Sequence, residues 1–523
     1  MHLRSVIFFL SVVTSVFGYN ILFMGPFPAP SHWMWLESFV DGLLERGHHV
    51  TVVSNHKRKI QHENCTELII DPPYDIPKYL PKSDIFKMRY ASDFQNLQMW
   101  WNIGVNTTEH ALNHPKVKSL IQMKTSPFDC LIMEQFFHES MLMFGHKFNI
   151  PVITAGTMGY ADYMDHAMGL LTPLSHIPHL LLPYKDDMTF KQRAYNFYLS
   201  VYDNFWRRFH YFPLMQSQAE KHFANYIEGP LPLVRDLEKK VSLMLINSHR
   251  SIDIPRPTIA GLVNVGGIHI KPAKPLPSDI RDFINGAEHG VVYFSLGSYM
   301  KSTDMPKDKI KMLMDGFSRL KQRVIWKYED ENIKNLPKNV LVKKWMPQND
   351  ILAQKNVVLF MTHGGLFGSQ EGIFWGKPML CIPLYGDQHR NTIKAVQEGY
   401  ALSAVLSQLT SDVLVEKINE VISNKRFSQK AKELSLRFRD NPISPKDEAM
   451  YWIEYIIRHK GAKHLKSKAV DMSLWEYLQL DIVFLYGGLA LLGLYVSLKV
   501  LYRLVFWVYV KHNENSNFDK KVQ

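Results

Sequence analysis

The chain has 523 residues, of which 46% are hydrophobic and 21% are charged, and its net charge is +12. This length is enough for two or three domains, and the composition fits a folded protein with membrane segments. A pI near 9.2 is compatible with nucleic acid, anionic lipid or an anionic nucleotide, but no basic run with interleaved aromatic residues supports nucleic acid. Three cysteines are too few for a disulfide framework, and no Cys/His cluster has the spacing of a metal site.

The first 18 residues resemble a cleavable secretory signal peptide. Arg4 is followed by an apolar run over residues 6–13 and by a short segment that ends at Gly18. An uncleaved anchor or a buried strand is the alternative interpretation. If the chain enters the secretory lumen, Asn64-Cys65-Thr66 and Asn106-Thr107-Thr108 are acceptors for N-glycosylation.

The amino-terminal half opens with the pattern of a βαβ unit. Residues 19–24 predict a strand, residues 33–46 an amphipathic helix with Ser31 as its N-cap, and residues 49–54 the next strand. This order is typical of a Rossmann-like parallel sheet.

Two ionisable residues of this half follow predicted strands. His32 lies near the start of the first helix, where the helix dipole disfavours imidazolium and leaves the ring able to act as a base. Glu134 ends the apolar run 128–133. Because the carboxyl ends of parallel strands share one edge of a sheet, we expect these two side chains to meet. Asp129 is the alternative partner for the histidine.

Residues 160–211 are rich in Met, Leu, Tyr, Phe and Pro without a clean periodicity. They either line an apolar cleft for an acceptor or form ordinary helical core. The segment 271–277 then carries three prolines and predicts a semi-rigid connector. Beyond it, residues 291–294 predict the first strand of a second domain, followed by a turn over 295–298.

The stretch 357–388 predicts the chemistry of the second domain. It alternates a strand over 357–361, a glycine-rich turn, a helix around 370–375 and a strand over 379–383. A glycine-rich turn before a helix N-terminus suits a diphosphate, because the backbone can approach closely and offers unpaired N–H groups. His363 would add a donor to the phosphates, and Glu371 would accept from ribose hydroxyls.

These residues resemble the donor-binding signature of the UDP-glycosyltransferases, and the similarity covers nearly the whole chain. The matching segments are Ser31-His32-Trp33, Arg46-Gly47-His48, Gly266-Gly267-Ile268-His269, Phe294-Ser295-Leu296-Gly297-Ser298, Trp345-Met346-Pro347-Gln348-Asn349-Asp350, His363-Gly364-Gly365, Pro378, Ile382-Pro383 and Asp387-Gln388. Leu366-Phe367-Gly368 departs from the vertebrate pattern and looks closer to insect members, and Phe367 has no polar group for a phosphate.

The resemblance implies an α/β fold with two facing Rossmann-like domains (the GT-B architecture) and an inverting transferase without a metal or other cofactor. In this interpretation His32 is the general base and Glu134 orients it. The donor residues implied are Ser298, Trp345, Gln348, His363, Gly364, Gly365, Gly368, Glu371, Asp387 and Gln388. Trp345 would stack on uracil and Gln348 with Glu371 would hold the uridine. Ser298, His363 and the glycines would contact the diphosphate, and Asp387 with Gln388 the hexose.

The carboxyl-terminal end predicts a membrane anchor. Residues 482–498 contain no charge, and Lys499, Arg503 and Lys511 follow them, which places the tail in the cytoplasm. The final Lys520-Lys521-Val522-Gln523 resembles a dilysine signal that retrieves membrane proteins to the endoplasmic reticulum. We therefore expect a single-pass protein of that membrane with its catalytic domains in the lumen.

The expected organisation is a signal peptide (1–18), an acceptor-binding domain (19–268), a linker (269–278), a donor-binding domain with returning helices (279–472), a transmembrane region (480–510) and a cytoplasmic tail (511–523). The expected partners are a UDP-sugar, a small lipophilic acceptor and a membrane, but no nucleic acid. The insect-like pattern favours UDP-glucose over UDP-glucuronate, and the sequence leaves a homo-oligomer open. The alternatives are a UDP-glucuronosyltransferase or a catalytically silent protein that binds a lipophile or nucleotide sugar.

Overall fold

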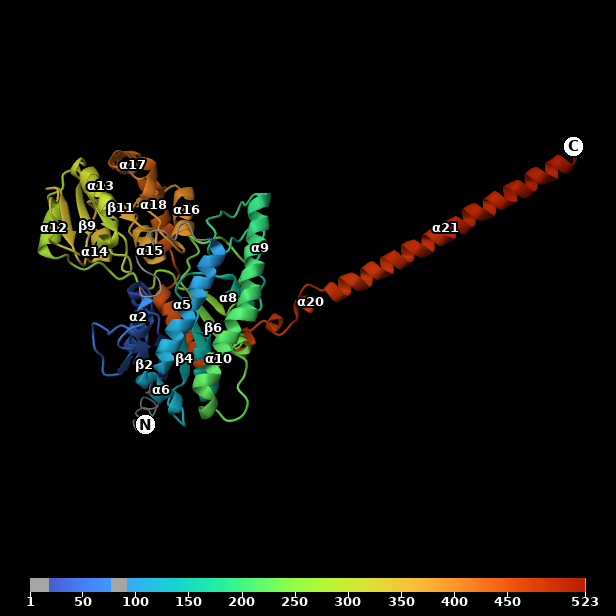
Figure 1. Ribbon diagram of the computed structural model, residues 1–523, viewed down its shortest axis with the longest axis horizontal. Coiled ribbons are helices and arrows are strands. Elements are labelled where there is room, and N and C mark those ends of the chain that lie inside the picture. The colour runs from blue at the N-terminus through green and yellow to red at the C-terminus, as the bar shows by residue number, and fades with distance from the viewer. Residues whose placement is uncertain (1–17, 77–91, 523) are drawn as a thin grey trace, which may run out of the picture. The chain divides into compact units, whose positions relative to one another are not determined.

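The computed structural model describes residues 18–76 and 92–522, with the side chains of 514–522 left aside. It divides into a body, residues 1–466, and a carboxyl-terminal unit, residues 467–523 (Figure 1). Except for Gly18, the expected signal peptide lies outside the described residues.

The first half of the body contains a seven-stranded parallel sheet in the order β3-β2-β1-β4-β5-β6-β7. Its strands are β1 (Asn20–Gly25), β2 (His49–Ser54), β3 (Cys65–Ile69), β4 (Cys130–Glu134), β5 (Val152–Gly156), β6 (Leu243–Ile246) and β7 (Leu262–Asn264). Successive residues of β1 enter different cores, with Ile21 and Phe23 in one and Leu22 and Met24 in the other. Both faces of this sheet are therefore covered, as the continuous apolar strands require.

The helices of this half are α2 (Pro30–Glu45), α5 (Asp93–Asn113), α6 (Pro115–Gln122), α7 (Met143–Phe148), α8 (Asp162–Ala167), α9 (Phe190–Trp206), α10 (Phe212–Phe223) and α11 (Val234–Glu238). A π-helical turn, Arg207–Tyr211, joins α9 to α10. The predicted βαβ opening is present, but Ser31 is not the N-cap of α2. The helix begins at Pro30, three residues before the predicted start, and Ala29 is its N-cap, because proline is pre-organised for the first helical position.

The second half of the body contains a six-stranded parallel sheet in the order β10-β9-β8-β11-β12-β13. Its strands are β8 (Val291–Ser295), β9 (Arg323–Lys327), β10 (Val340–Lys343), β11 (Val357–Thr362), β12 (Met379–Cys381) and β13 (Ala401–Ser403). Its helices are α12 (Ser278–Asn285), α13 (Lys307–Ser318), α14 (Gln348–Leu352), α15 (Leu366–Phe374), α16 (Gln388–Gln397), α17 (Ser411–Ser423) and α18 (Lys425–Arg439). Two parallel, doubly covered sheets confirm the α/β fold with two Rossmann-like domains.

The glycine-rich turn of the second sheet is shorter than the sequence predicts. Helix α15 begins at Leu366 with Gly365 as its N-cap, so Gly368 lies in its first turn and does not precede it. The strand expected over 379–383 ends at Cys381.

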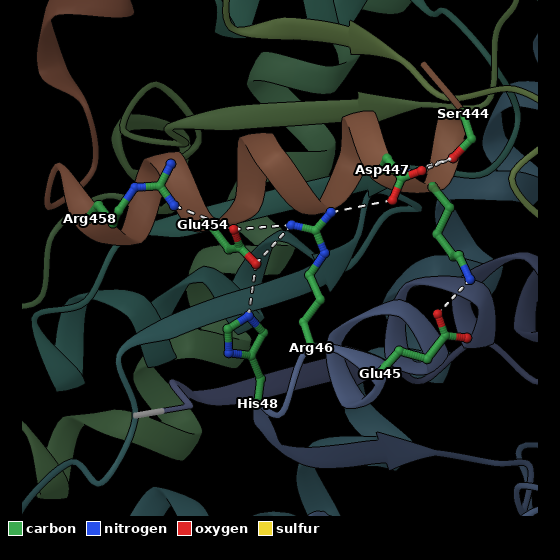
Figure 2. A network of polar contacts seen from close by, with 8 residues as sticks. Glu45, Arg46, His48, Ser444, Asp447, Glu454 and Arg458 are labelled. Atoms are coloured by element: carbon green, nitrogen blue, oxygen red, sulfur yellow. Dashed lines mark hydrogen bonds and ion pairs between the residues drawn. The ribbon is translucent and has the colours of Figure 1, made fainter. Parts of the chain in front are cut away.

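The last helix of the body, α19 (Pro445–Arg458), returns from the second half of the sequence to the first sheet. Glu454 accepts hydrogen bonds from Arg46 at 3.1 and 3.2 Å and lies 3.3 Å from Nε2 of His48 (Figure 2). Gly42 of α2 faces Met450, where a Cβ would lie only 2.9 Å from the Met450 sulfur. The Arg46-Gly47-His48 segment therefore has a structural task, which is to hold the returning helix.

The carboxyl-terminal unit contains α20 (Leu474–Tyr477) and the long helix α21 (Leu480–Val522). Within Leu480–Asn513 of α21, the most apolar 18-residue window has a mean hydropathy of 1.8 and is 0% buried. Length and composition thus make this segment a candidate membrane span, in agreement with the anchor predicted from the sequence.

Candidate active site

The first sheet brings His32 and Glu134 into direct contact. His32 is the third residue of α2, Glu134 is the last residue of β4, and β1 and β4 pair in parallel. His32 Nδ1 lies 2.5 Å from Glu134 Oε1, and both side chains are buried. A carboxylate at Nδ1 accepts the proton there, which leaves Nε2 as the basic nitrogen of the ring.

Thr157 completes this cluster and was missed by sequence reasoning. It directly follows β5, the neighbour of β4, and its hydroxyl donates to Glu134 Oε1 at 3.1 Å. The same hydroxyl lies 3.1 Å from His32 Nδ1. Its position after the apolar strand 152–156 was the available signal. Asp129 is not the partner, because it precedes β4 at the opposite edge and accepts the N–H of Asn20.

Aromatic side chains surround the imidazole. Phe27 and Phe136 have ring centroids 4.9 and 5.0 Å from that of His32, and Phe367 of α15 lies at 6.0 Å. Phe367 belongs to the apolar core of the first sheet although its helix belongs to the second. This packing explains a phenylalanine at that position, because its ring packs between the two domains beside the histidine. The expected contacts to phosphate are then left to other groups.

The second sheet assembles the expected diphosphate residues at the carboxyl ends of β8 and β11, where Ser295 pairs with Thr362. The His363 ring packs against Gly297 and Gly365, where added Cβ atoms would lie 2.7 and 2.4 Å from it. Burial lowers the pKa of His363 to about 4, so the ring is neutral at physiological pH. Gly364 has φ +78°, and a Cβ there would lie 2.5 Å from the hydroxyl of Thr392.

Ser298 carries a buried polar atom that has no protein partner. Its Oγ makes no hydrogen bond within residues 18–76 and 92–522. A buried hydroxyl without a partner is costly, so this atom is available to a ligand. With His363 and the N-terminus of α15, Ser298 forms an edge with donors suited to an anion.

Glu371 and Gln348, the residues expected to hold uridine, are in contact. Gln348 Nε2 donates to Glu371 Oε2 at 2.5 Å, and Tyr293 donates its hydroxyl proton to Gln348 Oε1 at 3.2 Å. Burial raises the pKa of Glu371 to about 7. Gly368 makes room for this pair, because a Cβ there would lie 3.3 Å from Gln348 Nε2. Trp345 precedes α14 with its side chain open to solvent.

Asp387 and Gln388 lie at the start of α16. Asp387 is the N-cap and accepts from Asn391 Nδ2 at 2.7 Å. Burial raises the pKa of Asp387, while the hydrogen bond from Asn391 lowers it. Gln388 Oε1 accepts the N–H groups of Leu384 and Tyr385, so this oxygen shapes the loop after β12.

A buried chain of hydrogen bonds links the two domains beneath these groups. Gln370 of α15 donates to Asn247 Oδ1 at 2.9 Å and accepts the N–H of Gly267 at 3.0 Å. Asn247 in turn donates to the carbonyl oxygen of Thr157 at 3.0 Å. The helix that faces the diphosphate site is thereby connected to the residue that holds Glu134.

No set of three His, Cys, Asp or Glu side chains in the described part of the chain is placed to hold a metal ion.

The comparisons with known proteins agree with this geometry. The family described as UDP-glucoronosyl and UDP-glucosyl transferase matches residues 25–515. UDP-glycosyltransferase UGT5 of Dactylopius coccus is 35% identical over 511 residues, with 95% of each chain covered. UDP-glucosyltransferase 2 of the same insect is 33% identical, with 89% of each chain covered. UDP-glucuronosyltransferase 2B13 of Oryctolagus cuniculus is 30% identical, with 87% of each chain covered.

Among solved structures, the glycosyltransferase VinC in complex with DTDP matches with a TM-score of 0.56 at 14% identity. The match covers 84% of this chain and 100% of VinC. A likeness at this identity concerns the fold, and it supports the GT-B architecture of two Rossmann-like domains.

Proposed function

This chain belongs to the UDP-glucoronosyl and UDP-glucosyl transferase family and is a glycosyltransferase with a UDP-sugar donor, and from this premise we propose that it transfers glucose to a hydroxyl of a small lipophilic acceptor. The contact between His32 and Glu134 carries the proposal, because it supplies a buried base at the edge where an acceptor can meet the donor. The aromatic surroundings of His32 favour an apolar acceptor such as a phenol.

In the proposed reaction, His32 Nε2 takes the proton of the acceptor hydroxyl while Glu134 balances the charge of the imidazolium. The acceptor oxygen forms a bond to the anomeric carbon, and the bond from that carbon to the diphosphate oxygen breaks. The electron pair of that bond leaves with UDP. Attack from the face opposite to UDP inverts the configuration at the anomeric carbon.

The donor residues act on the leaving group and the sugar. Ser298, His363 and the N-terminus of α15 donate hydrogen bonds to the diphosphate, where negative charge develops. Gln348 and Glu371 hold the uridine, with Trp345 stacking on uracil. Asp387 and Gln388 hold the hexose hydroxyls, Gln388 through its amide nitrogen. No metal is needed in this scheme, because fixed donors neutralise the diphosphate.

Glucose is favoured as the sugar because an insect relative is named a UDP-glucosyltransferase. The rabbit relative named a UDP-glucuronosyltransferase supports glucuronate as the second candidate. Turnover of a panel of phenols by microsomes containing the chain, with UDP-glucose and UDP-glucuronate in parallel, separates the two. Conjugation from UDP-glucose alone is expected. Conjugation from UDP-glucuronate alone would contradict the choice of glucose. Conjugation from neither donor would contradict the proposal that the protein transfers a sugar to phenols.

We also propose that the body lies in the lumen of the endoplasmic reticulum with a cytoplasmic tail. The basic residues Lys499, Arg503 and Lys511 support this orientation. Asn64 precedes β3 in a turn and suits glycosylation, whereas Asn106 lies within α5 beside the buried Thr107 and Thr108. Protease added to sealed microsomes should remove only the tail. Digestion of the body would contradict the orientation.

A further inference from the structure

Helix α9 and the π-helical turn after it present an exposed apolar face that neither sequence interpretation of residues 160–211 anticipates. Part of that segment is core, since Tyr160, Met164 and Met168 are buried. Six side chains of the face are between 48% and 76% exposed, namely Phe190, Phe197, Tyr198, Val201, Phe205 and Phe209. Figure 1 shows α9 as a long helix at the margin of the body. Folded soluble proteins seldom leave a continuous aromatic patch uncovered.

Buried polar contacts fix which face of α9 points outward. Asn196 donates to the carbonyl oxygens of Leu174 and Ile177, each at 2.9 Å. Asp203 lies 3.1 Å from Nε2 of His179. The helix cannot rotate its aromatic side to the interior without breaking these contacts, and breaking buried hydrogen bonds leaves unsatisfied polar groups.

The π-helical turn is anchored in the same way. Arg207 is buried and donates to Glu139 Oε1 at 2.8 Å and also to Glu238. With Arg207 held inside, its neighbours Arg208 and Phe209 are directed outward. The exposed face therefore continues from α9 across the turn, and its exposure is built into the fold.

Three exposed cations flank this face on α9 and the π-helical turn. Between Phe190 and Tyr211 the acidic residue is Asp203, which is buried, whereas Asp186 and Asp187 are exposed just before the helix. Lys191, Arg193 and Arg208 are exposed. The Arg193 guanidinium lies 6.0 Å from the ring centroid of Phe190, and that of Arg208 lies 5.7 Å from the ring of Phe209. Aromatic rings flanked by arginine and lysine are the composition that suits the boundary between lipid headgroups and acyl chains.

We propose that this face of α9 is a membrane-contacting surface that lies in the headgroup region of an anionic bilayer. The aromatic side chains enter the boundary of the acyl chains, and the three cations bind lipid phosphates and carboxylates. The chain has a reason to meet a bilayer, since Leu480–Asn513 is a candidate span. A second copy of the chain is the weaker occupant, because the guanidinium groups beside Phe190 and Phe209 match lipid phosphates.

Collisional accessibility of a nitroxide tests this surface in the full chain. The label is attached at Phe197→Cys, Val201→Cys or Phe205→Cys in a Cys65→Ser background, since Cys130 and Cys381 are buried. Leu436→Cys on α18 is the matched control, because it is an exposed apolar residue of a helix in the other domain. The protein is reconstituted into vesicles of phosphatidylcholine with a minority of phosphatidylserine.

At the three α9 positions, collisions with oxygen should exceed those with a water-soluble nickel complex several-fold, and the reverse should hold at position 436. Nickel accessibility at α9 equal to that at position 436 would overturn the proposal, since the face would then be in water. Exclusion of both reagents together with broadening between labels would also overturn it in favour of a second copy.

A second measurement tests the anionic part of the proposal. Replacing Lys191, Arg193 and Arg208 together by glutamine should reduce the preference of the α9 labels for oxygen in the anionic vesicles. With Lys191, Arg193 and Arg208 unchanged, the α9 labels should show a smaller preference for oxygen in vesicles of phosphatidylcholine alone than in the anionic vesicles. If neither change alters the accessibility, the surface does not recognise anionic lipid and the proposal is wrong in that respect.

Discussion

The polar edges of the two sheets differ in what their groups contact, although each keeps a buried oxygen without a hydrogen-bond partner in the described part of the chain, namely Oε2 of Glu134 and Oγ of Ser298. At the first edge, His32, Glu134 and Thr157 bond to one another across three adjacent elements. At the second edge, Ser298 has a buried hydroxyl without a partner in the described part of the chain, and Glu371 is held with a raised pKa.

This difference separates a catalytic task from a binding task. A base must be oriented before the acceptor arrives, so its hydrogen bonds are made within the protein. The residues proposed to bind the diphosphate and the ribose would form further hydrogen bonds when the ligand arrives, and the Ser298 hydroxyl has no other partner in the described part of the chain. Damage at the first edge should therefore slow turnover, and damage at the second should weaken the binding of UDP.

The largest effect is expected from His32→Ala. Loss of a general base typically costs about a hundred- to ten-thousand-fold in rate, so kcat should fall by that factor. UDP should bind as in the wild type, because the proposed donor residues belong to the other sheet. Parallel rate measurements and calorimetric titration with UDP check this. A loss of UDP affinity in His32→Ala as large as the loss of kcat would contradict the assignment of catalysis to the first edge and UDP binding to the second.

Glu134→Ala should also reduce kcat, by less than His32→Ala, because Glu134 acts through the imidazole. Glu134→Gln serves as the isosteric control: it keeps a hydrogen-bonding group but cannot balance the imidazolium charge. Glu134→Asp restores the charge with a shorter reach and should recover part of the rate. If the glutamine and aspartate variants were equally active, the charge of Glu134 would have no role in turnover.

Glu371→Ala and Asp387→Ala should affect different parts of donor recognition at the second edge: the first variant the uridine and the second the hexose. Losing hydrogen bonds to the Glu371 carboxylate should cost roughly 1.5–3 kcal/mol of UDP binding. Asp387→Ala should leave UDP affinity nearly unchanged and raise KM for UDP-glucose. Titration of UDP into both variants measures this, and equal losses would show that the two roles are wrongly assigned.

The smallest effect concerns pH. Burial raises the pKa of Glu371 to about 7, and only the ionised carboxylate accepts from both ribose hydroxyls. UDP-glucose, whose diphosphate does not titrate in this range, should bind several-fold more tightly as pH rises from about 6 to about 8. Glu371→Gln should bind more weakly and lose this dependence. An unchanged pH dependence in Glu371→Gln would assign it to another group.

The sequence predicted the strands that correspond to β1, β2, β4, β8, β11 and β12, because these are short apolar runs bounded by turn residues, and it left the other strands of both sheets unassigned. It also placed His32 and Glu134 at one edge, since strand order determines which ends meet. Two helix starts were wrong, because Pro30 and Gly365 set them earlier than the side-chain pattern indicated.

Other features depend on contacts that no local pattern contains. Thr157, Asn247 and Gln370 acquire their roles from residues that lie far away in the sequence. On α9 the polar residues Asn196 and Asp203 point inward beside Leu199, whereas Phe197 and Phe205 point outward. The periodicity of a helical sequence indicates that the two faces of the helix differ. It does not determine which face packs against the core.

The central claim is that His32 removes a proton from the acceptor, and a matched pair of acceptors tests it most directly. A thiophenol is far more acidic than the corresponding phenol and needs little help from a base. Turnover of both should be measured with wild type and His32→Ala under saturating donor. The account predicts that the variant loses about a hundred- to ten-thousand-fold with the phenol and much less with the thiophenol. Wild-type turnover of the phenol by His32→Ala, or an equal loss with both acceptors, would contradict it.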